Sequence, residues 1–209
     1  GKNHDQTPKN SSISFTLSHC TTKTSVLFKR TDKTSEGIDF DLIFDGKKNT
    51  SFRYKIVKFF SIIQEYCPYL KDYHLLISSS NSFPHSSGIA SSASSMSALS
   101  LCIMSLEKKL TLIDDDYFFK KASFISRIGS GSASRSVYGG VNFWGKHKEL
   151  NNSSDLYSVK LSKNISPKFN NYRDVILIID DKEKEVSSSV GHGLMNDNPF
   201  SKVRFNAAN

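Results

Sequence analysis

Alternating apolar and polar residues predict strands in the first part of the chain. Strict alternation over residues 13–17 is typical of a half-buried strand, and residues 24–28 and 40–44 are further strand candidates. Asp45-Gly46 closes the third run with a turn signal that is common in hairpins. We therefore expect the early part of the chain to be antiparallel β structure.

Helical spacing comes next along the chain. Apolar residues three or four positions apart predict a helix over residues 54–66, which Pro68 ends. A strand is expected at 74–78, and a second helix then runs to about Leu110.

A third helix is expected to continue to Gly129, with Thr111 as a candidate N-cap. The acidic run 114–116 would suit a metal site, but a solvated helix start, where acids favour the helix dipole, is the simpler interpretation.

The remainder of the chain is predicted to be mixed. Residues 141–144 and 156–161 are typical of strands, and the polar stretch between them is a candidate domain junction. The apolar run 175–179 is typical of a strand at the centre of a sheet, and a helix is expected to begin near Pro199.

The segment 83–95 lies between a predicted strand and a predicted helix and is rich in small residues. Free N–H groups and the dipole of a helix N-terminus favour anions, phosphate above all. A Ser-rich helix cap is the alternative, because neither G-x-G-x-x-G nor G-x-x-x-x-G-K-[ST] is present. The local pattern leaves both interpretations open.

The segment 127–140 is the second candidate site. Hydroxyls alternate with small residues beside Arg135, whose guanidinium offers a fork of donors to an anionic or carboxylate group. A flexible Gly/Ser linker is the alternative, although linkers rarely hold Arg135, Val137 and Tyr138 so close together. Trp144 is expected in the core or at an interface.

Composition narrows the function classes. The formal net charge of +8 suits an anionic ligand, nucleic acid or a solvated surface, but the basic residues are scattered, which disfavours nucleic acid. No apolar run is long enough to predict a membrane span. The 3 cysteines form no CxxC pair, which predicts reduced thiols and a cytoplasmic protein. The chain begins at Gly1 rather than Met, so a partial or processed chain is expected.

Together these segments resemble the diphosphomevalonate decarboxylase family of the GHMP kinase superfamily. Residues 83–95 resemble its phosphate loop, 129–140 its substrate loop and 186–191 a short motif early in its second domain. Gly1-Lys2, with residues 10–14 after it, resembles the end of the family's Tyr-Trp-Gly-Lys segment. The substrate loop is the specific part, because superfamily kinases such as mevalonate kinase generally place an Asp-bearing motif there.

The resemblance implies an α+β fold of two layers. Residues 1–150 would form a domain of the ribosomal S5 domain 2 type, and residues 151–209 an incomplete ferredoxin-like domain. The implied activity is a carbon–carbon lyase reaction that converts mevalonate 5-diphosphate, with ATP and Mg2+, into isopentenyl diphosphate, ADP, phosphate and CO2. The C3 hydroxyl would be phosphorylated first. The family is often dimeric, so a homodimer is a further expectation.

The resemblance also implies roles for particular residues. Those expected to bind ATP are Gly88, Ala90, Ser91, Ser92 and Ser94. Those expected to bind substrate are Lys2, Ser130, Ser132, Arg135, Ser187 and Ser188. Ser130 and Ser132 would hold the diphosphate or neighbouring oxygens, and Arg135 the carboxylate. No metal ligand is assigned.

The family's catalytic Asp would lie beyond Asn209, so we expect this chain to bind its ligands but to turn over poorly. His85-Ser86-Ser87 stands where many members carry Thr-Ala-Ala, and His192 where Met is common. Two alternatives stay open: a related GHMP small-molecule kinase without decarboxylation, and a non-catalytic S5-like domain that binds RNA.

Overall fold

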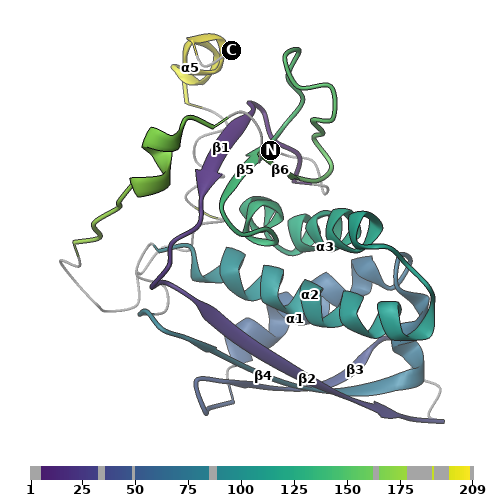
Figure 1. Ribbon diagram of the computed structural model, residues 1–209. Coiled ribbons are helices and arrows are strands. Elements are labelled where there is room, and N and C mark those ends of the chain that lie inside the picture. Colours follow the sequence, from purple (N-terminus) through teal and green to yellow (C-terminus); the bar gives the residue numbers. More distant parts are fainter. Residues whose placement is uncertain are drawn as a thin grey trace.

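The computed structural model describes residues 6–32, 36–48, 50–84, 89–161, 165–177, 190 and 198–207. Its elements, shown in Figure 1, are β1 (Ser12–Phe15), β2 (Thr22–Arg30), β3 (Asp39–Phe44), α1 (Thr50–Ile63), η1 (Pro68–Asp72), β4 (Tyr73–Asn81), α2 (Ser91–Leu110), α3 (Asp115–Gly129), η2 (Gly131–Ser136), β5 (Val141–Trp144), β6 (Val159–Lys160), η3 (Pro167–Asn171) and α5 (Ser201–Ala207).

One sheet has the strand order β2-β4-β3. β4 pairs antiparallel with β2 and parallel with β3, so it is the central strand. Alternate residues of β3 are buried, namely Phe40, Leu42 and Phe44. This period of two gives the sheet one apolar face, which must be covered by other elements.

The helices cover that face. α1 lies against β3, where the Phe40 and Phe60 ring centroids are 5.1 Å apart, and α2 packs on β2. α3 packs on α2 in turn, as Figure 1 shows. Ile63, Ile103 and Ile125, one from each helix, are fully buried in the resulting core. None of the described helices is both long and apolar enough to cross a membrane.

A second sheet has the order β1-β5-β6 and is antiparallel. Figure 1 shows it on the far side of α3 from the first sheet. β1 pairs with β5 from Ser12↔Trp144 to Phe15↔Val141, so residues near the start of the chain meet residues far along it.

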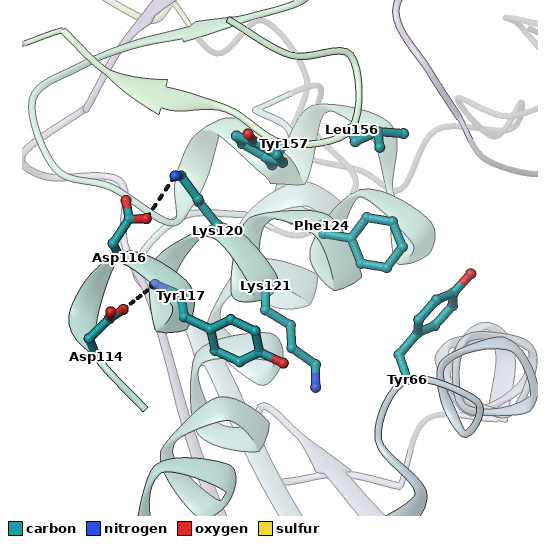
Figure 2. Close-up of a pocket in the computed structure, with 9 residues that line it drawn as sticks. All are labelled: Tyr66, Asp114, Asp116, Tyr117, Lys120, Lys121, Phe124, Leu156 and Tyr157. Carbon is teal, nitrogen blue, oxygen red and sulfur yellow. Dashed lines mark hydrogen bonds and ion pairs between the residues drawn. The ribbon is translucent and has the colours of Figure 1, made fainter. Parts of the chain in front are cut away.

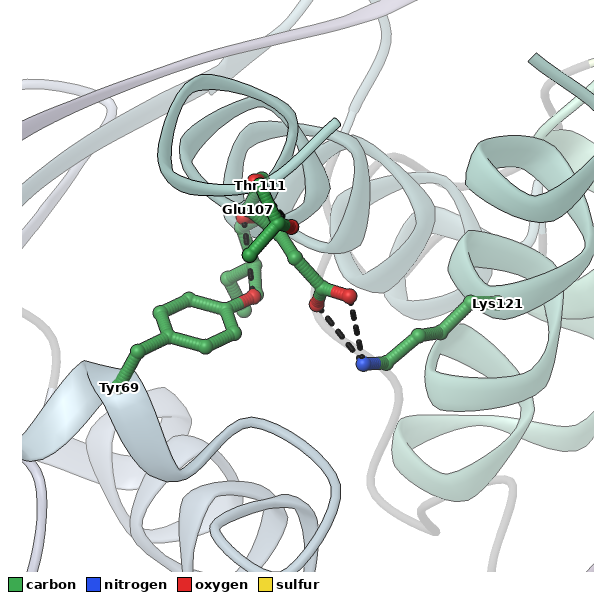
Figure 3. A network of polar contacts seen from close by, with 5 residues as sticks. Tyr69, Glu107, Thr111 and Lys121 are labelled. Atoms are coloured by element: carbon green, nitrogen blue, oxygen red, sulfur yellow. Dashed lines mark hydrogen bonds and ion pairs between the residues drawn. The ribbon is translucent and has the colours of Figure 1, made fainter. Parts of the chain in front are cut away.

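A buried ion pair joins α2 to α3 (Figure 3). Lys121 Nζ lies 2.8 Å from both carboxylate oxygens of Glu107, which is 7% exposed. The Tyr69 hydroxyl donates to the Ile103 carbonyl of the same helix at 3.3 Å, and its pKa is raised, first by burial and then by the nearby Cys67 and Glu107. This network fixes the position of α2 relative to α3 and η1.

The predicted antiparallel arrangement of the early strands is confirmed for β1 and β2, each of which pairs antiparallel with its partner, and is wrong for β3. β1, β2 and β3 do not pair with one another: β1 joins β5, and β3 runs parallel to β4. Alternation identifies a strand but not its partner. The Asp45-Gly46 turn is confirmed, with φ of 48° and 75°, the positive values of a type I′ turn, but it leads into α1 rather than a hairpin strand.

Thr111 is not the N-cap of α3. Asp114 caps that helix, because its carboxylate accepts from the Tyr117 N–H at 2.7 Å, and Thr111 instead ends α2 by donating to the Glu107 carbonyl. An Asp accepts from free N–H groups as well as a Thr does, and here it stands at the right distance from the first turn. The acidic run is therefore a helix start, with ion pairs Lys108–Asp115 and Lys120–Asp116 on the surface.

The strand prediction at 175–179 also fails where it can be checked. Residues 175–177 form no strand, and Val175 and Leu177 are more than three-quarters exposed. A strand needs a neighbour for its N–H and C=O groups, and no described strand pairs with these residues. The strand expected at 156–161 is shorter, Val159–Lys160, whereas 141–144 is confirmed as β5.

Candidate functional site

The first predicted site lies where β4 leads into α2. Ala90 precedes the helix with φ 58° and ψ 37°, the left-handed region that residues with a side chain seldom occupy. The Ala93 and Ser94 N–H groups bond its carbonyl at 3.0 and 3.2 Å. Gly88 lies outside the described residues. The sharp backbone turn at exposed Ala90 brings the chain directly into the first turn of a 20-residue helix.

The hydroxyls of this helix start have different surroundings. Ser91 is buried, whereas Ser92 and Ser94 are half-buried. Ser94 Oγ lies 2.6 Å from Thr22 Oγ1, which is also 2.6 Å from Asn81 Oδ1. Ser94 is thus tied to the ends of β2 and β4, so it anchors the helix start to the sheet.

The second predicted site follows α3, which ends at Gly129 as expected. Residues Gly131–Ser136 form a 3-10 helix in which Ala133 and Ser134 are fully buried, so this segment is not a flexible linker. Ser130 and Ser132 are half-buried.

The structure brings the two loops to the same end of α2. A Cβ on Gly129 would come within 2.7 Å of Met96 Sδ, so Gly129 lies directly against that side chain. Met96 is only five residues after Ser91, which corresponds to about 7.5 Å along the helix axis. The end of α3 therefore packs beside the second turn of α2, and η2 also contacts α2.

Buried hydroxyls fix the backbone of η2. Ser123 Oγ and Ser158 Oγ both donate to the Ser134 carbonyl, at 2.8 and 2.5 Å, and the Ser158 N–H donates to Ser123 Oγ at 2.9 Å. All three serines are fully buried. The peptide that precedes Arg135 is consequently held by α3 on one side and by the segment before β6 on the other.

The side chain of Arg135 is a half-buried cation. Its Nη1 donates to Ser12 Oγ at 3.0 Å, and its guanidinium carbon lies 5.9 Å from the centre of the Trp144 ring. Burial lowers the pKa of Arg135. Within the described part of the chain no carboxylate lies within ion-pair distance of it.

Sequence reasoning missed Gln6. Its Oε1 accepts from the Gly131 N–H at 2.5 Å, and its Nε2 donates to the Ile128 carbonyl at 3.2 Å. The start of the described chain therefore contacts the predicted substrate loop, residues 129–140. A single Gln in a polar stretch carries no signal that could have predicted this. Lys2, Ser187 and Ser188 lie outside the described residues, so their predicted roles stay predictions.

A cleft of about 570 Å³ lies elsewhere, along α3 (Figure 2). Its lining is formed by Tyr66, Asp114, Asp116, Tyr117, Lys120, Lys121, Phe124, Leu156 and Tyr157. Lys120 is paired with Asp116, and Lys121 with Glu107, so the cations in this cleft are already neutralised. None of the predicted site residues lines it. Arg135 is therefore the better anion site.

No group of three or more His, Cys, Asp or Glu side chains in the described ranges is arranged to hold a metal ion. The cysteines Cys20, Cys67 and Cys102 are all unpaired, as expected. The site is consequently one of hydroxyls, backbone N–H groups and one cation, which is the chemistry of anion recognition.

Three quarters of the chain matches a known protein family. Residues 1–156 match the family model described as diphosphomevalonate decarboxylase-like N-terminal domain. Among curated proteins, the chain is 30% identical over 194 residues to the diphosphomevalonate decarboxylase of Candida albicans, covering 88% of this chain and 50% of that one.

Solved structures match over nearly the whole chain. The mevalonate diphosphate decarboxylase of Staphylococcus aureus is 30% identical, with a TM-score of 0.74, covering 99% of this chain and 58% of that one. The complex of MDDEF with MVAPP, AMPPCP and magnesium is 26% identical, with a TM-score of 0.69, covering 99% of this chain and 59% of that one. The chain thus spans about half the length of these relatives.

Proposed function

Because the chain belongs to the family of diphosphomevalonate decarboxylase-like N-terminal domains, within the GHMP superfamily, we propose that it carries the ATP and substrate loops of an ATP-dependent decarboxylase of mevalonate 5-diphosphate. The products would be isopentenyl diphosphate, ADP, phosphate and CO2.

One observation carries the proposal: the Arg135 guanidinium is half-buried and, among the described residues, has a hydroxyl rather than a carboxylate as its polar partner. A cation withdrawn from water is stabilised when it gains an anionic partner. The planar fork of an Arg matches a carboxylate in two parallel hydrogen bonds. A substrate that brings its own carboxylate would supply the missing partner.

The remaining predicted residues would bind the substrate diphosphate and the ATP phosphates. Ser130 and Ser132 lie at the start of the 3-10 helix that also contains Arg135, and they would donate to the diphosphate of the substrate. Ala90, Ser91, Ser92 and Ser94, with Gly88, would surround the ATP phosphates at the N-terminus of α2, where the helix dipole favours negative charge. Lys2, Ser187 and Ser188 are proposed as further donors to the substrate.

Magnesium belongs to the same proposal. The MDDEF complex contains AMPPCP, MVAPP and magnesium together. Mg2+ typically binds through the phosphates of a nucleotide and through few protein groups, which fits a site whose described residues provide no cluster of metal ligands. When bound it would neutralise charge on the ATP phosphates.

In this proposal the residues of this chain orient the substrate and ATP relative to each other. Arg135 would hold the carboxylate while the hydroxyls and backbone N–H groups hold the two polyphosphates, so that the C3 hydroxyl faces the terminal phosphate of ATP. The C3 hydroxyl would receive the phosphoryl group, the C3–O bond would break with release of phosphate, and the carboxylate would leave as CO2 with its bonding electrons forming the new double bond. Fixed geometry of this kind removes much of the entropic barrier of a reaction between two ligands.

The division at residue 150, the cytoplasmic location and the homodimer stay predictions from the sequence. They affect neither the ligand assignments nor the experiment that tests them.

The first prediction concerns Arg135. We expect the chain to bind mevalonate 5-diphosphate, and Arg135→Ala to weaken that binding about 10- to 100-fold, because a charge-assisted bidentate pair is lost. Titration calorimetry on this chain measures the affinity. Lys120→Ala is the matched control, since it removes a cation that is already paired on the surface, and it should leave the affinity unchanged.

A paired product assay on the product of the complete gene tests the reaction. Equal release of ADP and CO2 from mevalonate 5-diphosphate and Mg-ATP is the expected result. ADP without CO2 would identify a kinase of the same superfamily instead. Failure to bind or convert the substrate, together with salt-dependent RNA binding, would favour the RNA-binding alternative.

A further inference from the structure

The guanidinium of Arg135 is held by a residue that is distant in sequence. Its Nη1 donates to Ser12 Oγ at 3.0 Å, and the two residues are separated by 123 positions. Ser12 belongs to β1, outside both predicted loops. A contact from β1 therefore orients Arg135, the residue that is predicted to bind the substrate carboxylate.

Ser12 and Trp144 form a platform for this side chain. They are directly opposite each other on β1 and β5, and the guanidinium carbon lies 5.9 Å from the Trp144 ring centre. The ring itself is fixed, because Trp144 is buried and its Nε1 donates to the Asp155 carbonyl at 3.0 Å. The hydroxyl and the aromatic face together restrict how Arg135 can turn.

The backbone of Arg135 is fixed independently by the hydroxyls on the Ser134 carbonyl. The long side chain of Arg135 still has several rotatable bonds, so a fixed backbone alone does not determine the direction of its guanidinium group. A guanidinium has five N–H donors, and Ser12 is the only described partner of a hydrogen bond from this one. The other donors remain available to a ligand.

We propose that Ser12 is a positioning residue that aims the Arg135 fork at the carboxylate of the substrate. This inference rests on the proposed function. Ser12 lowers the conformational entropy that Arg135 loses on binding, because the side chain is already oriented before the ligand arrives.

The test compares a ligand that has a carboxylate with one that has none. Mevalonate 5-diphosphate carries a carboxylate, a C3 hydroxyl and a diphosphate, whereas isopentenyl diphosphate keeps the diphosphate but has neither the carboxylate nor the hydroxyl. Titration calorimetry on this chain should show that Ser12→Ala weakens mevalonate 5-diphosphate binding about 5- to 20-fold, the range of one hydrogen bond to a charged group, and leaves isopentenyl diphosphate within about twofold. A general loss of loop structure would weaken both ligands.

Two further variants make the comparison specific. Ser12→Thr keeps the hydroxyl and should restore binding. Ser14→Ala removes the next hydroxyl on the same face of β1, which has no hydrogen-bond partner among the described residues, and should leave both affinities unchanged. Thermal unfolding of each variant shows that it is folded.

The outcomes separate the inference from the proposed function. In an Arg135→Ala background, Ser12→Ala should have no further effect, because the two act as one unit. A normal affinity in Ser12→Ala alongside a weakened Arg135→Ala would overturn the positioning role and leave the proposed function standing. A normal affinity in Arg135→Ala, or no binding by the unmodified chain, would overturn both.

Discussion

At the scale of single residues, close backbone contacts constrain the site as strongly as hydrogen bonds do. Gly145, directly after β5, has φ of +107°, and a Cβ there would lie 2.7 Å from the Cα of Ser11. Only a glycine lets the chain leave β5 so close to the start of β1. This approach keeps β1, with its Ser12, beside Arg135.

Gly145→Ala should therefore destabilise the protein by at least about 2 kcal/mol, because it adds backbone strain and a steric clash. Chemical denaturation measures the free energy of unfolding. Gly139→Ala is the matched control: nothing lies within 4 Å of its added Cβ. It should change stability by less than about 1 kcal/mol. An equal loss in both variants would contradict the assigned role of Gly145.

At the scale of elements, the far end of α2 is anchored by a buried charge pair in addition to the apolar contacts of Ile103, Met104 and Leu106. The pair Glu107–Lys121 joins α2 to α3, with side chains only 9% and 17% exposed. Burial opposes the charged form of Lys121, but its hydrogen bond to Glu107 and neighbouring charges outweigh this and raise the pKa above 10.5. A pair of this kind stabilises the native arrangement mainly by making every mismatched arrangement costly.

Glu107→Gln should cost about 3 kcal/mol of stability, because Lys121 keeps a buried charge without its anionic partner. Replacing both residues, as Glu107→Leu with Lys121→Met, should cost less than the single change. Lys120→Met breaks an exposed pair with Asp116 and should cost only about 0.3–0.5 kcal/mol. Urea titration of the parent chain and these variants measures the free energy of unfolding and checks the predicted order of the losses.

The pH dependence of the same pair has a definite sign. Because the folded-state pKa of Lys121 lies above its ordinary value of 10.5, the contribution of Lys121 is fully present below pH 10.5 and is lost only as the pH rises through the folded-state pKa. Lys121 should therefore add no slope to the stability of the protein between about pH 7 and pH 9. A Lys121→Met variant should show the same slope as the parent chain in that range.

At the scale of the whole molecule, two sheets lie on opposite sides of the helices (Figure 1), and the proposed site depends on both. The sheet β2-β4-β3 holds the start of α2 through Thr22 and Ser94, and the sheet β1-β5-β6 holds Arg135 through Ser12. The hydroxyl cluster around the Ser134 carbonyl joins the second sheet to α3.

Ser158→Ala should test that junction. It removes one donor to the Ser134 carbonyl from a fully buried position and should cost about 1–3 kcal/mol. Ser105→Ala, which removes an exposed hydroxyl bonded within its own helix, should change stability by less than about 0.5 kcal/mol. Thermal unfolding followed by calorimetry compares the two, and a neutral Ser158→Ala would show that the junction does not depend on this bond.

Local pattern accounts for much of this structure. Periodicity identified α2 up to Leu110 and the strand at 141–144, and glycine marked the end of α3. The two loops were predicted as sites because small residues and hydroxyls collect there, and their ligand roles stay predictions. Pairing between distant segments was not accessible: alternation does not specify that β1 joins β5, and neither Gln6 nor Ser12 differs locally from any polar loop or strand residue.

The pairing of β1 with β5 also predicts an order of folding events. The bonds Gln6–Gly131, Ser12–Arg135 and Thr16–Gly140 each close a loop of 123 to 125 residues. Loops of this length close slowly compared with the formation of local helix and turn contacts. The helices can collapse on β2-β4-β3 first, whereas Arg135 gains its partner only when the beginning of the chain returns to it. We therefore expect carboxylate binding to appear late in refolding, after the helices have packed on β2-β4-β3.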